Sequence, residues 1–376
     1  MMPAAPSEPE KYSIDEMMSR LTGSASDDPA EGELVTRSDG SQAVRVRKRK
    51  RRSNQPHKEK SEKIRRSRMV QVSAALILIF LAALAVGGAV VYANSVLGAH
   101  TAKYADFLDI CIALIGRAPK AGCHLVENRR ATLQVHLPQL PSAPDDAFYP
   151  LLGYLVGLLA GSRIPVVCGL ESARPNLDDL KAFGAAFATT SAAPMFHIVN
   201  VTPEAASARA AMAGLPPEVE HHITLEELRK AWRELDSAAD HQVDLVALGN
   251  PHFSETECGA LAKLLQGRQR HPDTAIVLTL GRAVSARAER NGDLEVLTAF
   301  GVNVITDTCW CMLEEPVVPP AARVIMTNSG KYAHYAPGLT GRQVHFGALS
   351  DCAETACTGQ STGLLPAWLE ADPLKA

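Results

Sequence analysis

The sequence predicts an α/β protein with mostly parallel sheets flanked by helices, preceded by a disordered tail and one transmembrane helix. After about residue 94, short β-branched apolar runs alternate with amphipathic segments of helical periodicity. This alternation is typical of parallel sheets that helices cover on both faces. Ahead of it, an uncharged apolar run from residue 70 to residue 93 is long enough to cross the hydrocarbon core of a bilayer.

Residues 1–44 are predicted to form a disordered N-terminal tail. They are rich in Pro, Ser, Glu, Asp and Gly, and they show no sustained apolar period. A segment of this composition buries too little apolar surface to offset the loss of chain entropy on folding.

Residues 45–68 form a strongly basic segment. They hold thirteen Lys or Arg and two Glu, whereas the rest of the chain has 25 basic and 39 acidic residues. Such a run occurs in nuclear-localisation or nucleic-acid-binding segments, and also on the cytoplasmic flank of membrane spans. The apolar run that follows favours the juxtamembrane interpretation. The acidic remainder excludes a chain that binds nucleic acid along its length, so no nucleic-acid partner is expected.

Residues 70–93 are predicted to be a transmembrane helix in contact with the lipid bilayer. The run lies far from the N-terminus, which favours a signal anchor over a cleaved signal peptide. The basic residues before it would hold the N-terminus in the cytoplasm, which makes this a single-pass membrane protein. Everything after Asn94 would then lie outside the cytoplasm.

The body of the chain contains seven apolar runs that are typical of buried strands. Thr224 with Glu227, and Ser254 with Glu257, have the spacing of capping boxes at helix starts. Pro203 suits the first position of another helix. The seven runs are Ile164–Leu170, Met195–Val201, Val243–Leu248, Ala275–Leu280, Val302–Ile305, Arg323–Met326 and Val344–Phe346.

Polar clusters follow three of these predicted strands directly. The first two are Gly249–Ser254 and Thr306–Trp310. The third begins at Met326, the last residue of its apolar run, and continues to Gly338. In open α/β sheets, ligands bind in the crevice outside the carboxyl ends of the strands. A thiol, a lysine, imidazoles and amide donors are therefore expected around one small-molecule site.

Four cysteines near the C-terminus have candidate ligand roles: Cys309, Cys311, Cys352 and Cys357. The paired C-x2-C spacings of a structural zinc site are absent, which disfavours zinc. Disulfides are possible outside the cytoplasm, but their connectivity cannot be deduced from spacing. An iron–sulfur cluster takes thiolates from separate loops, and Cys309 and Cys352 fit that pattern.

Several ordered blocks resemble the catalytic large subunit of the aconitase X family, over about residues 90–367. This resemblance implies an aconitase-like fold for residues 94–367. It also implies a hydro-lyase, or dehydratase, that removes water from a small hydroxy acid such as a hydroxyproline or phosphomevalonate. An iron–sulfur cluster, a small swivelling subunit and a cytoplasmic location of the lyase-like domain itself are implied as well. The blocks are Tyr92–Ala99, Ile164–Val166 with Gly169–Leu170, Asp179–Lys181, Phe196–Val199 with Val201–Glu204, Asp244–Ser254, Thr306–Trp310 and Met326–Gly338.

The resemblance also implies roles for single residues. Cys309 would be one cluster ligand and Cys352 another, with Cys357 as the alternative to Cys352. An open iron would act as a Lewis acid on the departing hydroxyl while a base removes a proton next to the carboxylate. The residues expected to act on the substrate are Lys331, His334 and Asn328 as catalytic groups and Asn250, His252 and Ser329 as binding groups.

The sequence departs from the family pattern at its front. The family has a long section ahead of the Asn94–Gly98 block that supplies another cysteine ligand, and no cysteine precedes Cys111 here. Three hypotheses follow: a membrane-anchored, incomplete and inactive relative; an anchored α/β domain that binds without catalysis; or a fusion of two coding sequences near Ala89–Ser95. The third is favoured, because the join falls inside a block of the fold and domain boundaries belong in exposed linkers.

Overall fold

The structure is a computed structural model that describes residues 33–36, 42–45, 87–104 and 108–370. The chain divides into two units, residues 1–70 and 71–376. In the first unit, strands β1 (Glu33–Thr36) and β2 (Gln42–Arg45) pair in antiparallel fashion. The other residues of the predicted tail, 1–44, and of the basic segment, 45–68, lie outside the described residues.

Only the end of the predicted transmembrane helix, 70–93, falls within the described residues. Residues 87–95 are helical, and Val91 is fully buried in the largest core cluster. Gly88 and Val91 lie against helix α5 (Leu177–Thr190), beside Ala185 and Gly184. No helix in the described ranges combines the length and apolarity that a membrane span requires. The prediction is therefore wrong for the last turns, which are apolar because they pack against protein; residues 70–86 lie outside the described ranges.

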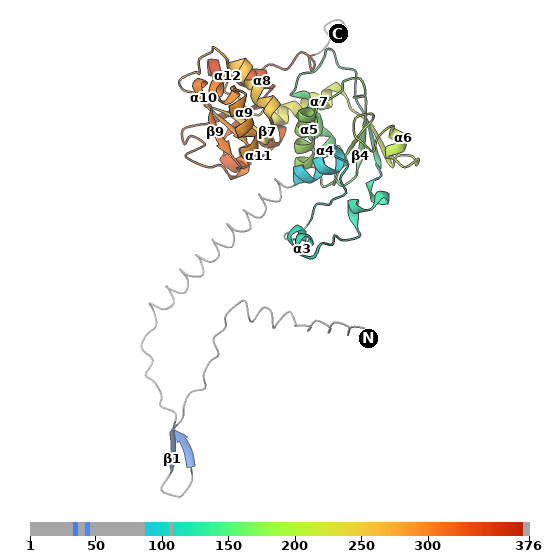
Figure 1. Cartoon of the computed structure of the whole chain (residues 1–376), viewed down its shortest axis with the longest axis vertical. Coiled ribbons are helices and arrows are strands. Elements are labelled where there is room, and N and C mark those ends of the chain that lie inside the picture. Colours follow the sequence, from blue (N-terminus) through green and yellow to red (C-terminus); the bar gives the residue numbers. More distant parts are fainter. Residues whose placement is uncertain (1–32, 37–41, 46–86, 105–107, 371–376) are drawn as a thin grey trace, which may run out of the picture. The chain divides into compact units, whose positions relative to one another are not determined.

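Two parallel sheets build the second unit (Figure 1). The first has the strand order β5-β4-β3-β6, and its four strands all run parallel. Two of them lie in predicted runs, whereas β3 and β6 were not predicted. The strands are β3 (Leu133–His136), β4 (Pro165–Cys168), β5 (His197–Ile198) and β6 (Val219–His222).

The second sheet has the order β11-β10-β7-β8-β9 and is also fully parallel. All of its strands coincide with predicted runs to within a few residues. This confirms the predicted α/β class with parallel sheets. The strands are β7 (Leu245–Phe253), β8 (Ala275–Leu280), β9 (Asn303–Thr306), β10 (Val324–Thr327) and β11 (Gln343–Phe346).

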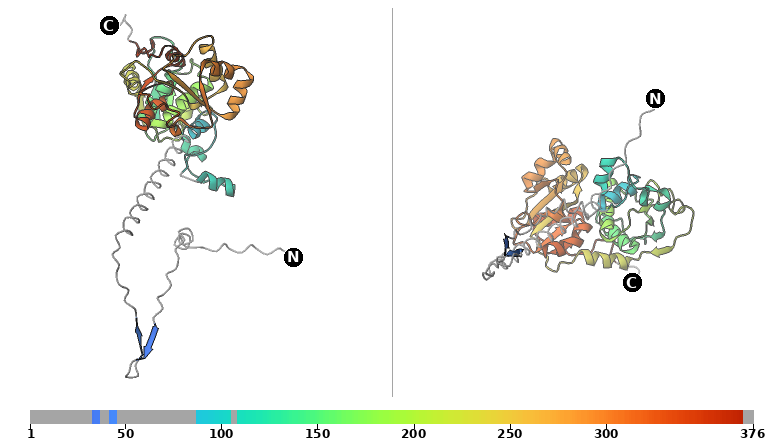
Figure 2. Two further views of the ribbon diagram at one scale, coloured as in Figure 1. Left: turned by 90° about the vertical axis from the view of Figure 1, so that its left-hand side faces the viewer. Right: turned by 90° about the horizontal axis from the view of Figure 1, so that it is seen from below.

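A layer of helices lies between the two sheets and belongs to the core of both (Figures 1 and 2). It contains α4 (Phe148–Ala160), α5, α7 (Leu225–Leu235) and α11 (Gly330–Thr340). The outer face of the five-stranded sheet is covered by α8 (Glu255–Leu265), α9 (Arg282–Arg290), α10 (Asp293–Phe300) and α12 (Leu349–Thr358). The remaining helices are α3 (Leu108–Ile115), α6 (Ala208–Ala211) and the 3-10 turns η1 (Gly122–His124), η2 (Val126–Arg129) and η3 (Trp310–Met312).

Glycines allow α4 and α5 to pack closely. A Cβ atom on Gly153 would lie 2.2 Å from the carbonyl oxygen of Phe183, and one on Gly157 would lie 2.1 Å from Oγ1 of Thr190. Both values are far below ordinary van der Waals contact, so only glycine fits at these two positions of α4.

Local capping signals were partly confirmed. The side chains of Thr224 and Ser254 accept the predicted capping-box hydrogen bonds at the starts of α7 and α8. The prediction that Pro203 begins a helix is wrong. The next helix, α6, begins at Ala208 after Ser207 as its N-cap.

Candidate functional site

The predicted polar clusters converge at the carboxyl edge of the five-stranded sheet. The chain passes from β7 to β8 and β9 on one side, whereas β10 and β11 lie on the other side of β7. The carboxyl ends of β7 and β10 therefore form a topological switch point, where α/β proteins bind ligands. A cavity of about 20 Å³ lies there, lined by Pro150, Ala182, Asn250, Pro251, Phe253, Glu257, Asn328, Ser329 and Gly330.

Helix α11 begins at this cavity. The Ser329 hydroxyl accepts a hydrogen bond from the Tyr332 amide at 3.0 Å and donates one to the backbone oxygen of Asn250. The first turn of α11 abuts α4, because a Cβ atom on Gly330 would lie 3.0 Å from the backbone oxygen of Pro150. Lys331 follows in the same turn and is only 6% exposed. The start of α11 attracts anions, because helix N-termini carry partial positive charge, and the charge of Lys331 acts on the neighbouring thiol of Cys309.

The loop after β9 supplies a pair of thiols. Trp310 is buried, donates from Nε1 to the backbone oxygen of Leu248 at 2.6 Å, and lies 4.9 Å from the ring of Tyr332. This anchors Cys309 and Cys311 on either side of it.

These two thiols shift each other's pKa in opposite directions. The hydrogen bond from the Cys311 thiol lowers the pKa of Cys309 to about 5, and the positive charges of Lys331 and His252 act in the same direction. The hydrogen bond to Cys309 raises the pKa of Cys311, and burial adds to this. Cys309 is therefore the thiol of the pair that ionises more readily, and the thiolate is the form that acts as a nucleophile or metal ligand.

Two residues from the end of β7 complete the arrangement. His252 hydrogen-bonds through Nε2 to the backbone oxygen of Thr308 at 2.8 Å, so it ties the end of β7 to the loop that bears Cys309. Asn250 is 4% exposed, and the thiol of Cys311 is the one polar group in the described residues that its side chain approaches; its Nδ2 atom makes no other hydrogen bond there. Because buried amide donors are nearly always paired, this atom is available to a ligand or a water molecule.

A charged network beside this cavity was not predicted from the sequence. Lys181 pairs with Asp178 at 2.9 Å and with Glu257, and it donates to the backbone oxygen of His252 at 3.2 Å. Burial raises the pKa of Glu257, although the ammonium of Lys181 opposes this shift. The sequence contained a signal for Lys181 and for Glu257. Lys181 is the last residue of a block that resembles the family, and Glu257 was predicted only as part of a capping box.

Three predicted residues lie elsewhere. His334 is exposed on α11, with its ring 5.6 Å from Tyr154 and 5.0 Å from Tyr335. Cys352 is fully buried in α12 within an apolar cluster, and burial raises its pKa well above the usual range. Cys357 lies in the last turn of α12, where burial again raises the pKa.

These positions bear on the iron–sulfur expectation. Cys309 fits a metal ligand, since its lowered pKa favours the thiolate. Cys352 does not fit as its partner, because its thiol is packed among apolar side chains and the charges nearest to it are the carboxylates of Asp351 and Asp146. In the described residues, no hydrogen bond joins the two thiols. Of the two cysteines predicted as cluster ligands, Cys309 is therefore suitable and Cys352 is not.

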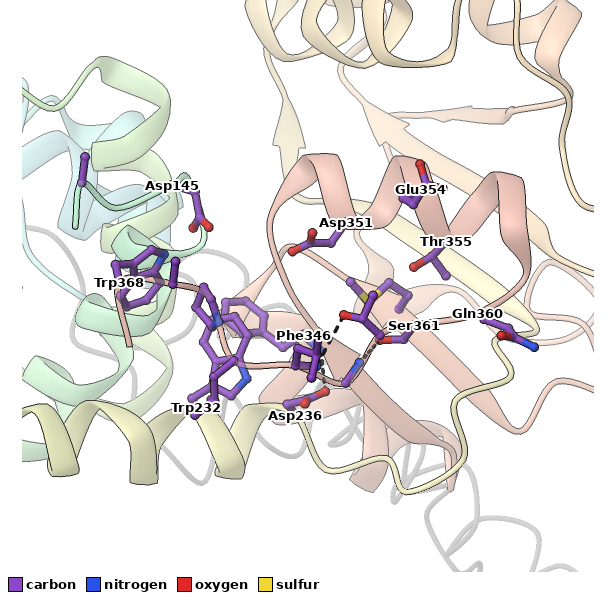
Figure 3. A pocket seen from close by; sticks show the side chains of 18 residues that line it. Asp145, Trp232, Asp236, Phe346, Asp351, Glu354, Thr355, Gln360, Ser361 and Trp368 are labelled. Carbon is purple, nitrogen blue, oxygen red and sulfur yellow. Dashed lines mark hydrogen bonds between the residues drawn. The ribbon is translucent and has the colours of Figure 1, made fainter. Parts of the chain in front are cut away.

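A larger cavity, of about 280 Å³, contains none of the predicted residues (Figure 3). Trp232 of α7 and Asp351 of α12 project into it. Its carboxylates stabilise the fold: Asp236 accepts from the Phe346 amide at 3.1 Å, and Asp351 accepts from the Ala348 amide at 2.9 Å. The candidate site is therefore the small cavity at the switch point.

Comparison with known proteins identifies one family along most of the chain. Models of the first, second and third domains of aconitase X match residues 82–127, 130–233 and 243–358. The first match begins inside the predicted transmembrane segment, 70–93, and ahead of the predicted join at Ala89–Ser95. Aconitase X similarity therefore extends further towards the N-terminus than the sequence blocks indicated.

Individual relatives are similar over about 250 to 280 residues. The cis-3-hydroxy-L-proline dehydratase of Pseudomonas aeruginosa is 58% identical over 284 residues, which are 76% of this chain and 49% of the relative. The phosphomevalonate dehydratase large subunit of Methanothermobacter thermautotrophicus is 37% identical over 67% of this chain and 60% of its own length. The chain thus spans about half the length of the first relative. A crystal structure of Thermococcus kodakaraensis aconitase X in its holo-form superposes with a TM-score of 0.63 and 29% identity, over 72% of this chain and 66% of that one.

Proposed function

Because this chain belongs to the aconitase X family, we propose that it acts as a dehydratase on a small hydroxy acid, with cis-3-hydroxy-L-proline as the first candidate substrate. The choice of substrate is supported by the higher identity to the hydroxyproline dehydratase, 58% against 37% for the phosphomevalonate enzyme. Phosphomevalonate is the second candidate.

The observation that carries the proposal is the set of donors at the switch point. Asn250 and Asn328 line the cavity at the start of α11, and the buried Lys331 follows in the same turn. A substrate carboxylate at this cavity would accept hydrogen bonds from the amides of Asn250 and Asn328 and from the first turn of α11, with the positive charge of Lys331 close by. Ser329 holds this turn and Asn250 together.

We assign the removal of the proton next to the carboxylate to Glu257. It lines the same cavity, and its raised pKa favours a base that can also release the proton. Lys181 and His252 act as positioning residues, since Lys181 bridges Glu257 and the backbone of His252. Among the described residues, Cys309 is the thiol best suited to bind iron, which would act as a Lewis acid on the departing hydroxyl. The relative named as a large subunit supports a small partner subunit for this chain as well.

Binding and turnover test the proposal separately. The chain is prepared metal-free and after anaerobic incubation with iron(II), and each preparation is mixed with cis-3-hydroxy-L-proline or with phosphomevalonate. Calorimetry measures binding of each acid, and proton NMR measures its loss of water. Lys331→Ala should weaken binding by about 10–100-fold, since a hydrogen bond to a charged group contributes about 1.5–3 kcal/mol. Lys263→Ala, an exposed lysine of α8, is the matched control.

The outcomes separate the hypotheses. Binding that depends on Lys331, together with turnover, supports the dehydratase. Binding that depends on Lys331 without turnover in any metal state supports the α/β domain that binds without catalysis. If neither acid binds, or if both lysine variants behave alike, the proposed site is wrong.

A further inference from the structure

Three side chains with metal-binding atoms lie on one face of the four-stranded sheet, away from the switch point of the other sheet. His136 is on β3, and Glu220 and His222 are on the neighbouring strand β6. In the parallel register, His136 pairs with His222, and Gln134 pairs with Glu220. Because side chains alternate between faces along a strand, these positions all point to the same side.

The separations of the ligand atoms suit a single cation. Oε1 of Glu220 lies 2.9 Å from Nε2 of His136 and 3.7 Å from Nε2 of His222, and all three atoms lie within 4.8 Å of one another. Two ligands of a tetrahedral zinc ion, each about 2.1 Å from the metal, are about 3.4 Å apart. The two observed separations lie on either side of this value.

The two imidazole rings require only a local adjustment. Their centroids are 4.4 Å apart and their planes differ by 9°, so the rings are stacked. A cation held by both Nε2 atoms needs one ring to rotate out of the stack. His222 is exposed and can do so, since 73% of its side chain is accessible.

Two further groups adjoin the cluster. Cys168 of β4 pairs in register with His136 on the other side of β3. Nε2 of Gln134 lies 3.1 Å from Nε2 of His136 and 3.8 Å from Sγ of Cys168. Cys168 does not belong to the group whose ligand atoms lie within 4.8 Å of one another, so a fourth position of the ion is left to water.

We propose that His136, Glu220 and His222 form a binding site for a divalent transition-metal ion such as Zn²⁺. Two imidazoles and one carboxylate favour zinc, cobalt or nickel over magnesium and calcium, which prefer oxygen ligands. The ion would join β3 to β6, the edge strand of this sheet, whose residues are mostly exposed. Its role is therefore to stabilise the edge of this sheet, independently of the proposed dehydratase site.

Metal titration of the full chain tests this site. Purified protein freed of metal is titrated with Zn²⁺ by calorimetry and with Co²⁺ by visible absorption. The variants are the double substitution His136→Ala/His222→Ala and the conservative Glu220→Gln. His221→Ala is the matched control, because this neighbouring histidine pairs with Glu227 on the opposite face. Cys309→Ser identifies any binding at the thiol pair.

The expected result is one equivalent of Zn²⁺ that is lost in the double variant, weakened in Glu220→Gln and kept in His221→Ala and Cys309→Ser. Zn²⁺ should also raise the melting temperature of the wild type and of His221→Ala, but not that of the double variant. Circular dichroism of the metal-free proteins establishes that the double variant is folded. Equal binding in the wild type and the double variant would overturn the proposal, as would loss of all binding in Cys309→Ser.

Discussion

Replacing Gly153 by alanine should destabilise the helical layer between the two sheets. The new Cβ atom would lie 2.2 Å from the carbonyl oxygen of Phe183 and 2.9 Å from its Cα and carbonyl carbon. The obstacle is backbone, so no side chain can rotate away. Ordinary contact would require α4 and α5 to separate by about 1 Å, and overpacking of this kind costs about 1–3 kcal/mol.

The net effect is the difference between two terms. Alanine is about 1 kcal/mol more favourable than glycine inside a helix, and the clash with backbone should cost about 3 kcal/mol, at the upper end of the overpacking range. We therefore expect a loss of about 2 kcal/mol in the free energy of unfolding, which lowers the melting temperature by roughly 4–8 °C for a domain of this size. Urea titration and thermal unfolding measure the two quantities.

A second glycine provides the control. Gly338 lies within α11, and a Cβ atom there would meet nothing within 4 Å. Gly338→Ala should therefore stabilise the protein by up to about 1 kcal/mol through helix propensity alone. If Gly153→Ala were as stable as the wild type while Gly338→Ala behaved as expected, the close packing of α4 on α5 would be refuted.

Three further predictions concern the thiol pair, its anchor and a buried histidine. Cys311→Ala should raise the pH at which iodoacetamide alkylates Cys309 in the metal-free protein, because the hydrogen bond from Cys311 is the main cause of the low pKa of Cys309. Peptide mass spectrometry measures the extent of alkylation at each pH, and an unchanged pH profile would contradict the prediction. Trp310→Phe removes the hydrogen bond to the Leu248 carbonyl and should cost about 1–3 kcal/mol in urea titrations; an unchanged midpoint would contradict it. Burial opposes protonation of His345, but its hydrogen bond to Asp236 prevails and raises the pKa. The stability gap between wild type and His345→Gln should be complete below about pH 6.5 and shrink as pH rises through the higher folded-state pKa; a gap that grows with pH would contradict it.

The five-stranded sheet could be predicted because its strands lie in continuous apolar runs, most of which are buried, although β9 at the edge is not. The strands β3 and β6 were missed for the opposite reason. The sequences Leu133–His136 and Val219–His222 contain histidines and other polar residues, since one face of this sheet is partly exposed. A search for apolar runs does not detect strands of this kind.

Backbone topology explains why some of the predicted residues lie close together. Asn250 lies near the carboxyl end of β7, and Ser329 and Cys309 follow β10 and β9, so their proximity follows from the parallel sheet alone. His334 and Cys352 lie on helices, where the side chain's direction depends on packing that the sequence does not reveal. Glu257 was missed because its helix-capping role, which is real, gave no reason to look for a second one.

The helical layer that the two sheets share makes them one cooperative unit. Its core cluster includes Leu133 of the first sheet and Ile325 of the second, with Phe183 of α5 between the sheets. The second and third family domains cover residues 130–233 and 243–358. They are therefore units of sequence similarity, and neither is a unit that folds independently of the other. Either segment expressed alone would leave its share of this core in contact with water, so the second unit should melt in a single transition.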